Sequence, residues 1–212
     1  MSFPAPAVLR GREHLPFPIV HPIEVESYTI LRARLDVADL PPLTRAVVER
    51  IVHTTADPTW AGELVCDEDA LTAGQAALLA GAPLVTDVRM VAAGITARPS
   101  VVALDLAGPP ENGPTRSAAG IRAAVAAHGD GAVWAIGNAP TALAELVRVA
   151  GTGFLRTPLV VGLPVGFVGA VAAKAALRVS GLPAVSNRSE RGGAAVAAAA
   201  VNALLYAGRD GC

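Results

Sequence analysis

Short apolar runs alternate with helical segments along the second half of the chain. The apolar runs have the length of buried strands, and each leads into a turn: Pro83–Thr86, Val101–Leu104, Ala132–Ile136, Leu159–Leu163 and Pro183–Val185. The helices predicted between and after them are Ser117–Ala127, Ala139–Ala150, Gly169–Val179 and Gly193–Tyr206. Strands that alternate with helices of about a dozen residues indicate βαβ units and a mainly parallel sheet.

The first part of the chain shows a different pattern of residues. Residues 1–22 are rich in proline and show no period, which predicts an extended N-terminal arm. Helices are predicted over Val25–Leu35, Leu43–Val52 and Asp67–Leu79, the last with Asp67 as its N-cap. No repeat or linker divides the rest, so we predict a single α/β domain over residues 23–212, with a mainly parallel sheet flanked by helices.

Polar or glycine-rich residues follow the predicted strands. They are Asp87, Asp105, Asn138, Pro164–Gly166 and Asn187. Ligands of open α/β sheets bind outside the carboxyl ends of the strands, so these positions predict a large cleft there. Capping of the following helices explains each Asp or Asn about equally well.

Composition narrows the class of protein. The chain has 212 residues, is 52% hydrophobic and only 17% charged, against about 25% charged on average, which excludes disorder. A net charge of −1 argues against nucleic acid as a partner. The two cysteines, Cys66 and Cys212, exclude a disulfide scaffold. No uncharged stretch makes a good membrane span and no signal peptide is visible, so we expect a soluble, cytoplasmic protein without a membrane partner.

Cofactor motifs are weak. Gly162–Gly169 reads G-x-x-x-G-x-x-G, which is neither the dinucleotide fingerprint nor a Walker loop, so close approach to a ligand or tight helix packing explains it better. The four histidines show no metal-ligand spacing, and no metal site is predicted. A serine-hydrolase elbow is absent from the sequence.

Two residues are candidates for chemistry. His53 stands at the end of an amphipathic helix, where a structural or C-capping histidine is the commoner case, but a histidine there can also transfer protons near neutral pH. Arg116 lies beside Thr115 and Ser117, either of which could open a helix whose N-terminus attracts anions. Its guanidinium would bind carboxylates, although a plain surface arginine is as common.

Several segments, taken in order, resemble one family. They are Ile23–Tyr28, Ile51–Asp57, Thr86–Asp87 with Met90 and Gly94–Ile95, Thr115–Ser117, Gly137–Leu143, Gly162–Gly169 with Lys174, Gly192–Gly193 and Asn202–Tyr206. This set resembles the precorrin-8X methylmutase family, including its cobalt-precorrin-8 branch, from about Pro22 to Tyr206. His53–Asp57 and Asn202–Tyr206 look more like the cobalt-dependent, anaerobic branch.

The resemblance implies an isomerase of corrin biosynthesis that works as a homodimer on a tetrapyrrole (corrinoid) substrate. The reaction it implies moves a methyl group from C11 to C12 of the macrocycle and gives hydrogenobyrinate, or cobyrinate when cobalt is present. No cofactor is implied, in keeping with the absent cofactor motifs. A non-catalytic corrinoid-binding protein of the same fold is the alternative, and a generic α/β nucleotide enzyme is a distant third.

Residue by residue, the resemblance implies that His53 is the catalytic acid and then base, and that Ser27 contacts the substrate. Arg116 is expected at the substrate's carboxylates. Four further residues are expected to line the site: Thr115, Asp87, Asn138 and Lys174. Two positions depart from the family pattern: Ala172 and Ala173 replace an acidic residue and a serine, and Ala194 and Ala195 follow the Gly-Gly pair in place of Ser-Asn.

Overall fold

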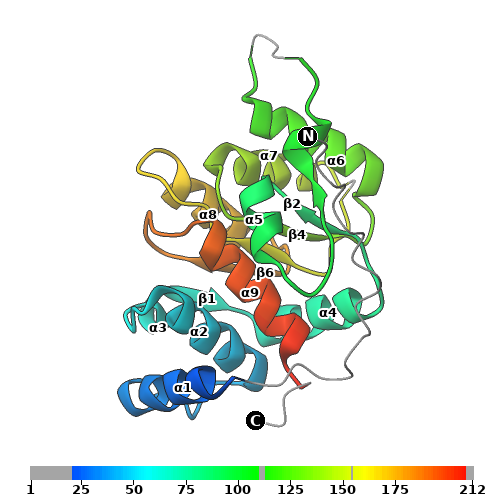
Figure 1. Ribbon diagram of the computed structural model, residues 1–212. Coiled ribbons are helices and arrows are strands. Elements are labelled where there is room, and N and C mark those ends of the chain that lie inside the picture. Colours follow the sequence, from blue (N-terminus) through cyan, green and yellow to red (C-terminus); the bar gives the residue numbers. More distant parts are fainter. Residues whose placement is uncertain (1–20, 110–112, 154, 209–212) are drawn as a thin grey trace, which may run out of the picture.

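The computed structural model describes residues 21–109, 113–153 and 155–208. The predicted arm over residues 1–22 lies outside this range apart from His21 and Pro22, which form the start of helix α1 (Pro22–Arg34). From there the chain folds as one α/β domain, as predicted (Figure 1). Within these ranges no helix combines the length and the apolar character that a membrane span needs.

The described strands form one six-stranded sheet in the order β1-β6-β5-β4-β2-β3. Their bounds are Leu64–Cys66 (β1), Leu84–Thr86 (β2), Val101–Val102 (β3), Val133–Ile136 (β4), Val160–Gly162 (β5) and Ala184–Asn187 (β6). β1 runs antiparallel to β6, and every other neighbouring pair is parallel. The carboxyl ends of β2 to β6 therefore meet at one edge of the sheet, which we call the carboxyl edge.

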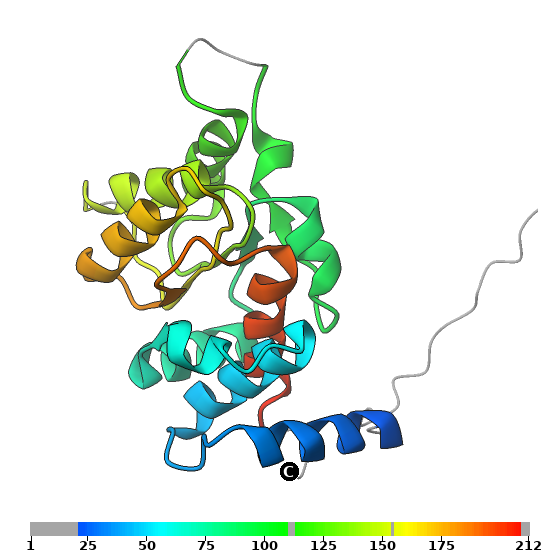
Figure 2. The same ribbon diagram turned by 90° about the vertical axis from the view of Figure 1, so that its left-hand side faces the viewer.

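Helices cover both faces of the sheet (Figures 1 and 2). Successive side chains of a strand point to opposite faces, so Trp134 and Ile136 of β4 pack on one side and Val133 and Ala135 on the other. The first side holds α6 (Arg116–His128), α7 (Pro140–Ala150) and α8 (Ala170–Val179). The second holds α2 (Pro42–Thr55), α4 (Glu68–Leu79), α5 (Arg89–Gly94) and α9 (Ala194–Tyr206). Burial on both faces explains why the strands read as continuous apolar runs rather than alternating ones.

Helix α9 is part of the core. Its sequence left open whether its Ala-rich surface forms a dimer contact or is buried inside the domain. Val196, Val201 and Leu204 are almost completely inaccessible, and a Cβ placed on Gly137 would lie 2.7 Å from the Cβ of Ala197. Small side chains thus let α9 lie directly against the end of β4, and the helix is buried within the domain.

The N-terminus of α4 is capped by the residue that the sequence predicts. The side chain of Asp67 accepts hydrogen bonds from the N–H groups of Asp69 and Ala70, as predicted for the N-cap. The sequence missed three short elements: β1, α3 (Trp60–Glu63) and α5. The predicted strand Val101–Leu104 is also shorter, because a 3-10 helix (η1, Ala103–Leu106) begins directly after β3.

Candidate functional site

Asp87 directly follows β2 and binds the loop between β4 and α7. It is 1% exposed, and its carboxylate accepts hydrogen bonds from the backbone N–H groups of Gly137 (3.2 Å), Asn138 (2.8 Å) and Ala139 (2.8 Å). Burial raises the pKa of this carboxyl, and these hydrogen bonds act in the opposite direction. Asp87 therefore holds the loop between β4 and α7 from the end of a neighbouring strand.

This arrangement decides against helix capping as the role of Asn138. The N-cap of α7 is Ala139 rather than Asn138, and no side chain of the loop itself caps the helix. Pro140, the first residue of the helix, has no N–H, and the N–H groups of Asn138 and Ala139 bind Asp87. The side chain of Asn138 is left exposed at the carboxyl edge.

The start of α6 lies against the start of α7. Of the two residues that could open α6, Thr115 is the N-cap: its Oγ1 accepts a hydrogen bond from the N–H of Ala118. The same Oγ1 lies 2.8 Å from Oγ1 of Thr141 in α7. Arg116 is the first residue of α6 and is exposed, and no ion pair engages it among the residues that the structure describes. The structure thus groups Thr115, Arg116 and Asn138 near the same helix starts.

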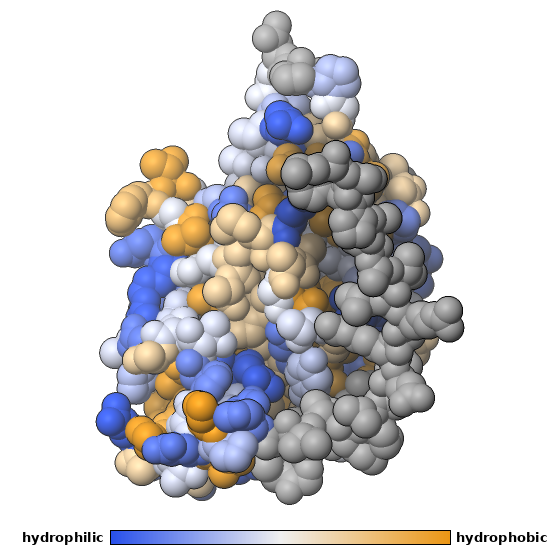
Figure 3. Space-filling model, viewed as in Figure 1, coloured by the Kyte–Doolittle hydropathy of each residue, from blue (hydrophilic) through white to orange (hydrophobic). Residues whose placement is uncertain are grey.

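The glycine-rich loop Gly162–Gly169 joins β5 to α8. A Cβ on Gly162 would lie 2.4 Å from Cδ2 of Leu177, which accounts for this glycine by tight helix packing. At the tip of the loop Phe167 and Val168 are 96% and 89% exposed, and this tip protrudes from the domain (Figures 1 and 3). The loop therefore presents apolar side chains beside the carboxyl edge.

Lys174, the only lysine of the chain, lies in α8 beneath the loop that joins β6 to α9. Its ammonium is completely buried and donates to Oδ1 of Asn187 (2.8 Å) and to the backbone oxygens of Ser189 and Arg191 (2.7 Å for Arg191). Burial lowers the pKa of Lys174 to about 8. Its three N–H donors all serve the end of β6 and the loop that follows it.

His53 lies in the last turn of α2 and is half-buried. Its Nδ1 lies 2.9 Å from Oγ of Ser27 in α1, so the structure brings these two predicted residues into contact. The ring of Tyr28 stacks on the imidazole with 4.9 Å between centroids and 9° between planes. Two contacts therefore fix the ring, one at Nδ1 and one on its face, while Nε2 has no hydrogen-bond partner among the described residues.

Sequence reasoning missed the surroundings of this histidine. The guanidinium of Arg50 lies 5.9 Å from the ring centre of Tyr28 and 5.7 Å from that of Tyr206, and it pairs with Glu24. Burial raises the pKa of Tyr28, so its phenol stays neutral. No spacing rule predicts such a cluster, since its members come from α1, α2 and α9.

The described cavities do not connect the predicted residues. A cavity of about 450 Å³ lies between α1, α2 and α9, and Tyr28, Arg50 and Tyr206 are among its lining residues. Neither His53 nor Arg116 lines it. The segment after α2 contacts the β6–α9 loop at the carboxyl edge, because Arg191 of that loop donates to Thr59 and Asp57. In Figure 1 the loops before α8 and α9 lie on the same side as α3, the side that faces the viewer in Figure 2.

Fold and site together define an α/β protein with a six-stranded, mainly parallel sheet and a half-buried histidine that is hydrogen-bonded to a serine of the neighbouring helix. The family model described as precorrin-8X methylmutase (CbiC) matches residues 22–207. Precorrin-8X methylmutase of Pseudomonas aeruginosa is 39% identical over 191 residues, which cover 84% of this chain and 91% of that protein. Cobalt-precorrin-8 methylmutase of Methanothermobacter thermautotrophicus is 37% identical and covers 82% and 86%, respectively.

A solved structure agrees with these relatives. The crystal structure of precorrin-8x methyl mutase from Thermus thermophilus superimposes with a TM-score of 0.80 at 33% identity, covering 90% of this chain and 98% of that one. The chain belongs to the precorrin-8X methylmutase family, a family of isomerases of cobalamin biosynthesis.

Proposed function

We propose that this enzyme moves a methyl group from C11 to C12 of precorrin-8X or cobalt-precorrin-8, giving hydrogenobyrinate or cobyrinate. The observation that carries the proposal is the contact between His53 and Ser27, because it holds the imidazole at Nδ1 and leaves Nε2 open. The curated relatives carry both substrate names at similar identity, so both substrates belong in the test.

In the proposed mechanism His53 acts first as a general acid. Its Nε2 gives a proton to a ring nitrogen of the macrocycle, and the positive charge draws electron density and eases migration of the methyl group. The proton then returns to Nε2, so the enzyme is unchanged at the end of the cycle. General acid–base catalysis contributes about 10²- to 10⁴-fold, and positioning of the macrocycle must supply much of the rest.

Other residues have binding roles in the proposal. Arg116 binds carboxylates of the substrate, which its exposed place at the start of α6 permits. Thr115 and Asn138 line the same region, whereas Asp87 and Lys174 contribute by shaping its loops, since their polar atoms are engaged within the protein.

We further propose that the enzyme is a homodimer in the cytoplasm. Three apolar side chains close to the carboxyl edge are 66% to 96% exposed: Met90, Phe167 and Val168. Burying them against a second copy would be favourable and would help to enclose a large macrocycle.

The alternative is a corrinoid-binding protein of this fold that has no catalytic activity. Incubation with metal-free and cobalt-loaded substrate in parallel, followed by visible absorption, separates the two, because the methyl shift changes the conjugation of the macrocycle. We expect His53→Ala to lower turnover by at least 10²-fold and to leave product binding largely intact.

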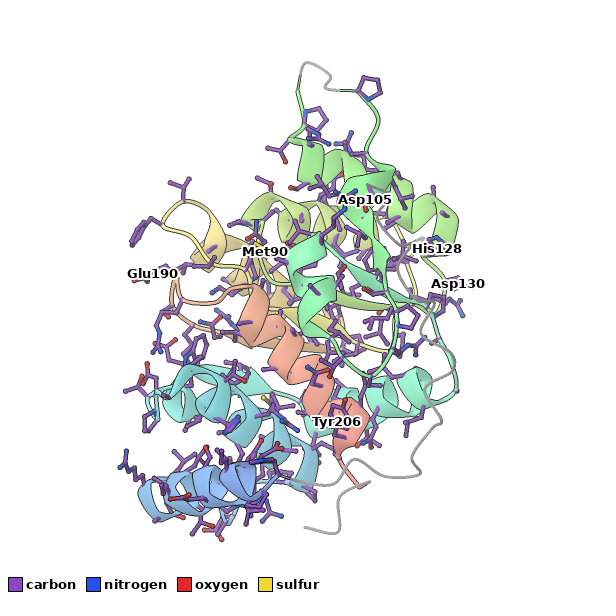
Figure 4. All side chains as sticks on the ribbon, viewed as in Figure 1. Met90, Asp105, His128, Asp130, Glu190 and Tyr206 are labelled. Carbon is purple, nitrogen blue, oxygen red and sulfur yellow. The ribbon has the colours of Figure 1, made fainter. Side chains whose placement is uncertain are left out.

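The matched control is His128→Ala. His128 also stands in the last turn of its helix, α6, and lies beside Asp130 on the side of the sheet remote from the carboxyl-edge loops (Figure 4). Its replacement should leave turnover unchanged. Wild-type turnover in His53→Ala would remove the assigned role, and binding without turnover in the wild type would favour the alternative.

A further inference from the structure

The chain reverses direction directly after the helix that carries His53. Helix α2 ends at Thr55, and Ala56 has φ 53° and ψ 29°, the only positive φ among the described non-glycine residues. Left-handed backbone is unfavourable for alanine, so this reversal needs support from outside the helix.

That support comes from Arg191. One nitrogen of its guanidinium donates to Oγ1 of Thr59 (2.8 Å) and another pairs with Oδ2 of Asp57. The guanidinium carbon also lies 4.4 Å from the ring centre of Trp60, which is itself buried. One side chain thus contacts three residues of the segment Ala56–Trp60.

The segment Ala56–Trp60 presents hydrogen-bond acceptors to the side chain of Arg191. Oδ1 of Asp57 accepts hydrogen bonds from the N–H and the hydroxyl of Thr59, which leaves Oδ2 to face Arg191. The hydrogen bonds from Thr59 lower the pKa of Asp57, and the charge of Arg191 adds to the effect, so the carboxylate is ionised at neutral pH.

The backbone of Arg191 is fixed from the opposite direction. Its carbonyl oxygen accepts from Nζ of Lys174 and from Nδ2 of Asn187 (3.0 Å). The next residues are held against β5, because Gly193 donates to the carbonyl oxygen of Leu163 (2.9 Å) and a Cβ on Gly192 would lie 2.3 Å from that oxygen. The loop 188–193 is therefore fastened to the rigid part of the sheet.

We propose that Arg191 is a positioning residue for the methyl transfer: it fastens the segment Ala56–Trp60, and with it the end of α2 that carries His53, to the carboxyl edge of the sheet. The inference rests on the proposed role of His53. Arg191 does not touch the reacting atoms. It sets how His53 lies relative to the glycine-rich loop, which is joined to the same loop 188–193 by the hydrogen bond from Gly166 to Glu190 (3.0 Å).

The test compares Arg191→Met with Arg188→Met. Arg188 stands in the same loop, is exposed, and its side chain makes no hydrogen bond with the described residues. Misplacement of a catalytic group by about 1 Å can cost about 10²-fold in rate, so we expect Arg191→Met to lower kcat about tenfold or more with KM within about twofold. Arg188→Met should match the wild type. The kcat of Arg191→Lys should lie between those of Arg191→Met and the wild type, because one ammonium cannot bridge Asp57 and Thr59 as the planar guanidinium does.

A second measurement reads the position of His53 directly. In Arg191→Met the 13C-labelled Cε1–H signal of His53 should shift or broaden in NMR spectra, and in Arg188→Met it should not. If Arg191→Met fails to fold, Asp57→Asn replaces it: the amide oxygen keeps the bonds to Thr59 but loses the charge that Arg191 faces, and kcat should fall several-fold.

The outcomes separate this inference from the proposed function. Wild-type kcat in Arg191→Met, with His53→Ala inactive, overturns the positioning role alone. Raised KM with unchanged kcat also overturns it and makes Arg191 a substrate-binding residue. Full activity in His53→Ala would instead remove the proposed function on which the inference rests.

Discussion

Lys174 offers a sharp test of the electrostatics beneath the carboxyl edge. Its ammonium is completely buried, and its hydrogen-bond acceptors are one amide oxygen and two backbone oxygens rather than a carboxylate. Burial lowers its pKa from 10.5 to about 8, and the more distant charges of Glu63 and Glu190 oppose that shift. The folded protein therefore releases this proton at a lower pH than the unfolded chain does.

The sign of the pH effect follows from proton counting. Between about pH 8 and 10.5 the unfolded chain binds more protons at Lys174 than the folded protein, so the free energy of unfolding rises with pH. One pKa unit corresponds to about 1.4 kcal/mol, and the contribution between pH 7 and pH 10 amounts to about 2–3 kcal/mol. Below pH 7 the contribution is constant, because both states hold the proton.

The assay is urea unfolding followed by tryptophan fluorescence at pH 7, 8, 9 and 10, on the wild type and on Lys174→Met. Subtracting the variant removes other groups that titrate in this range. The free energy of unfolding of the wild type minus that of Lys174→Met should rise by about 2–3 kcal/mol between pH 7 and pH 10. A difference that stays constant within about 0.5 kcal/mol would refute the reasoning, since it would mean that folding does not move the pKa of Lys174.

Two further predictions concern the backbone near the same loop. Ala56→Gly should raise the free energy of unfolding by about 0.5–1 kcal/mol in urea unfolding, because glycine adopts the left-handed conformation of Ala56 without a steric penalty; a loss of stability would contradict this. Gly192→Ala should lower it by about 2 kcal/mol or more, since the new Cβ would lie 2.3 Å from the oxygen of Leu163 and 2.6 Å from that of Pro164, both backbone atoms. Gly62→Ala, where a Cβ meets nothing within 4 Å, is the control, and equal melting temperatures for the two variants would count against the close approach.

The alternation of apolar runs and helices was enough to predict the architecture. All five parallel strands and the helices that follow β4, β5 and β6 lie where the sequence placed them, within a few residues. The missed elements β1, α3 and α5 are three to six residues long. Such short segments carry too few residues for a period to show, and β1 is formed by its pairing with β6.

For the candidate site the sequence proposed members but not their geometry. Ser27 and His53 were expected in the site and the structure places them in contact. The polar residues after the strands divide into two kinds that the sequence cannot separate: Asp87 turns inward and binds backbone N–H groups of the β4–α7 loop, whereas Asn138 is exposed. The role of these side chains depends on which N–H groups lie opposite, and that is a property of strand order.

The sequence by itself determined the fold class, the carboxyl edge and the family, because hydrophobic periodicity and ordered motifs are local properties of the chain. Only the tertiary structure decided what surrounds His53 and what holds its helix. Tyr28 stacks on it from α1, and Arg191 reaches the end of its helix from a loop more than a hundred residues later. The contact of Arg191 with Asp57 arises only once the sheet order β1-β6-β5-β4-β2-β3 has brought their segments together.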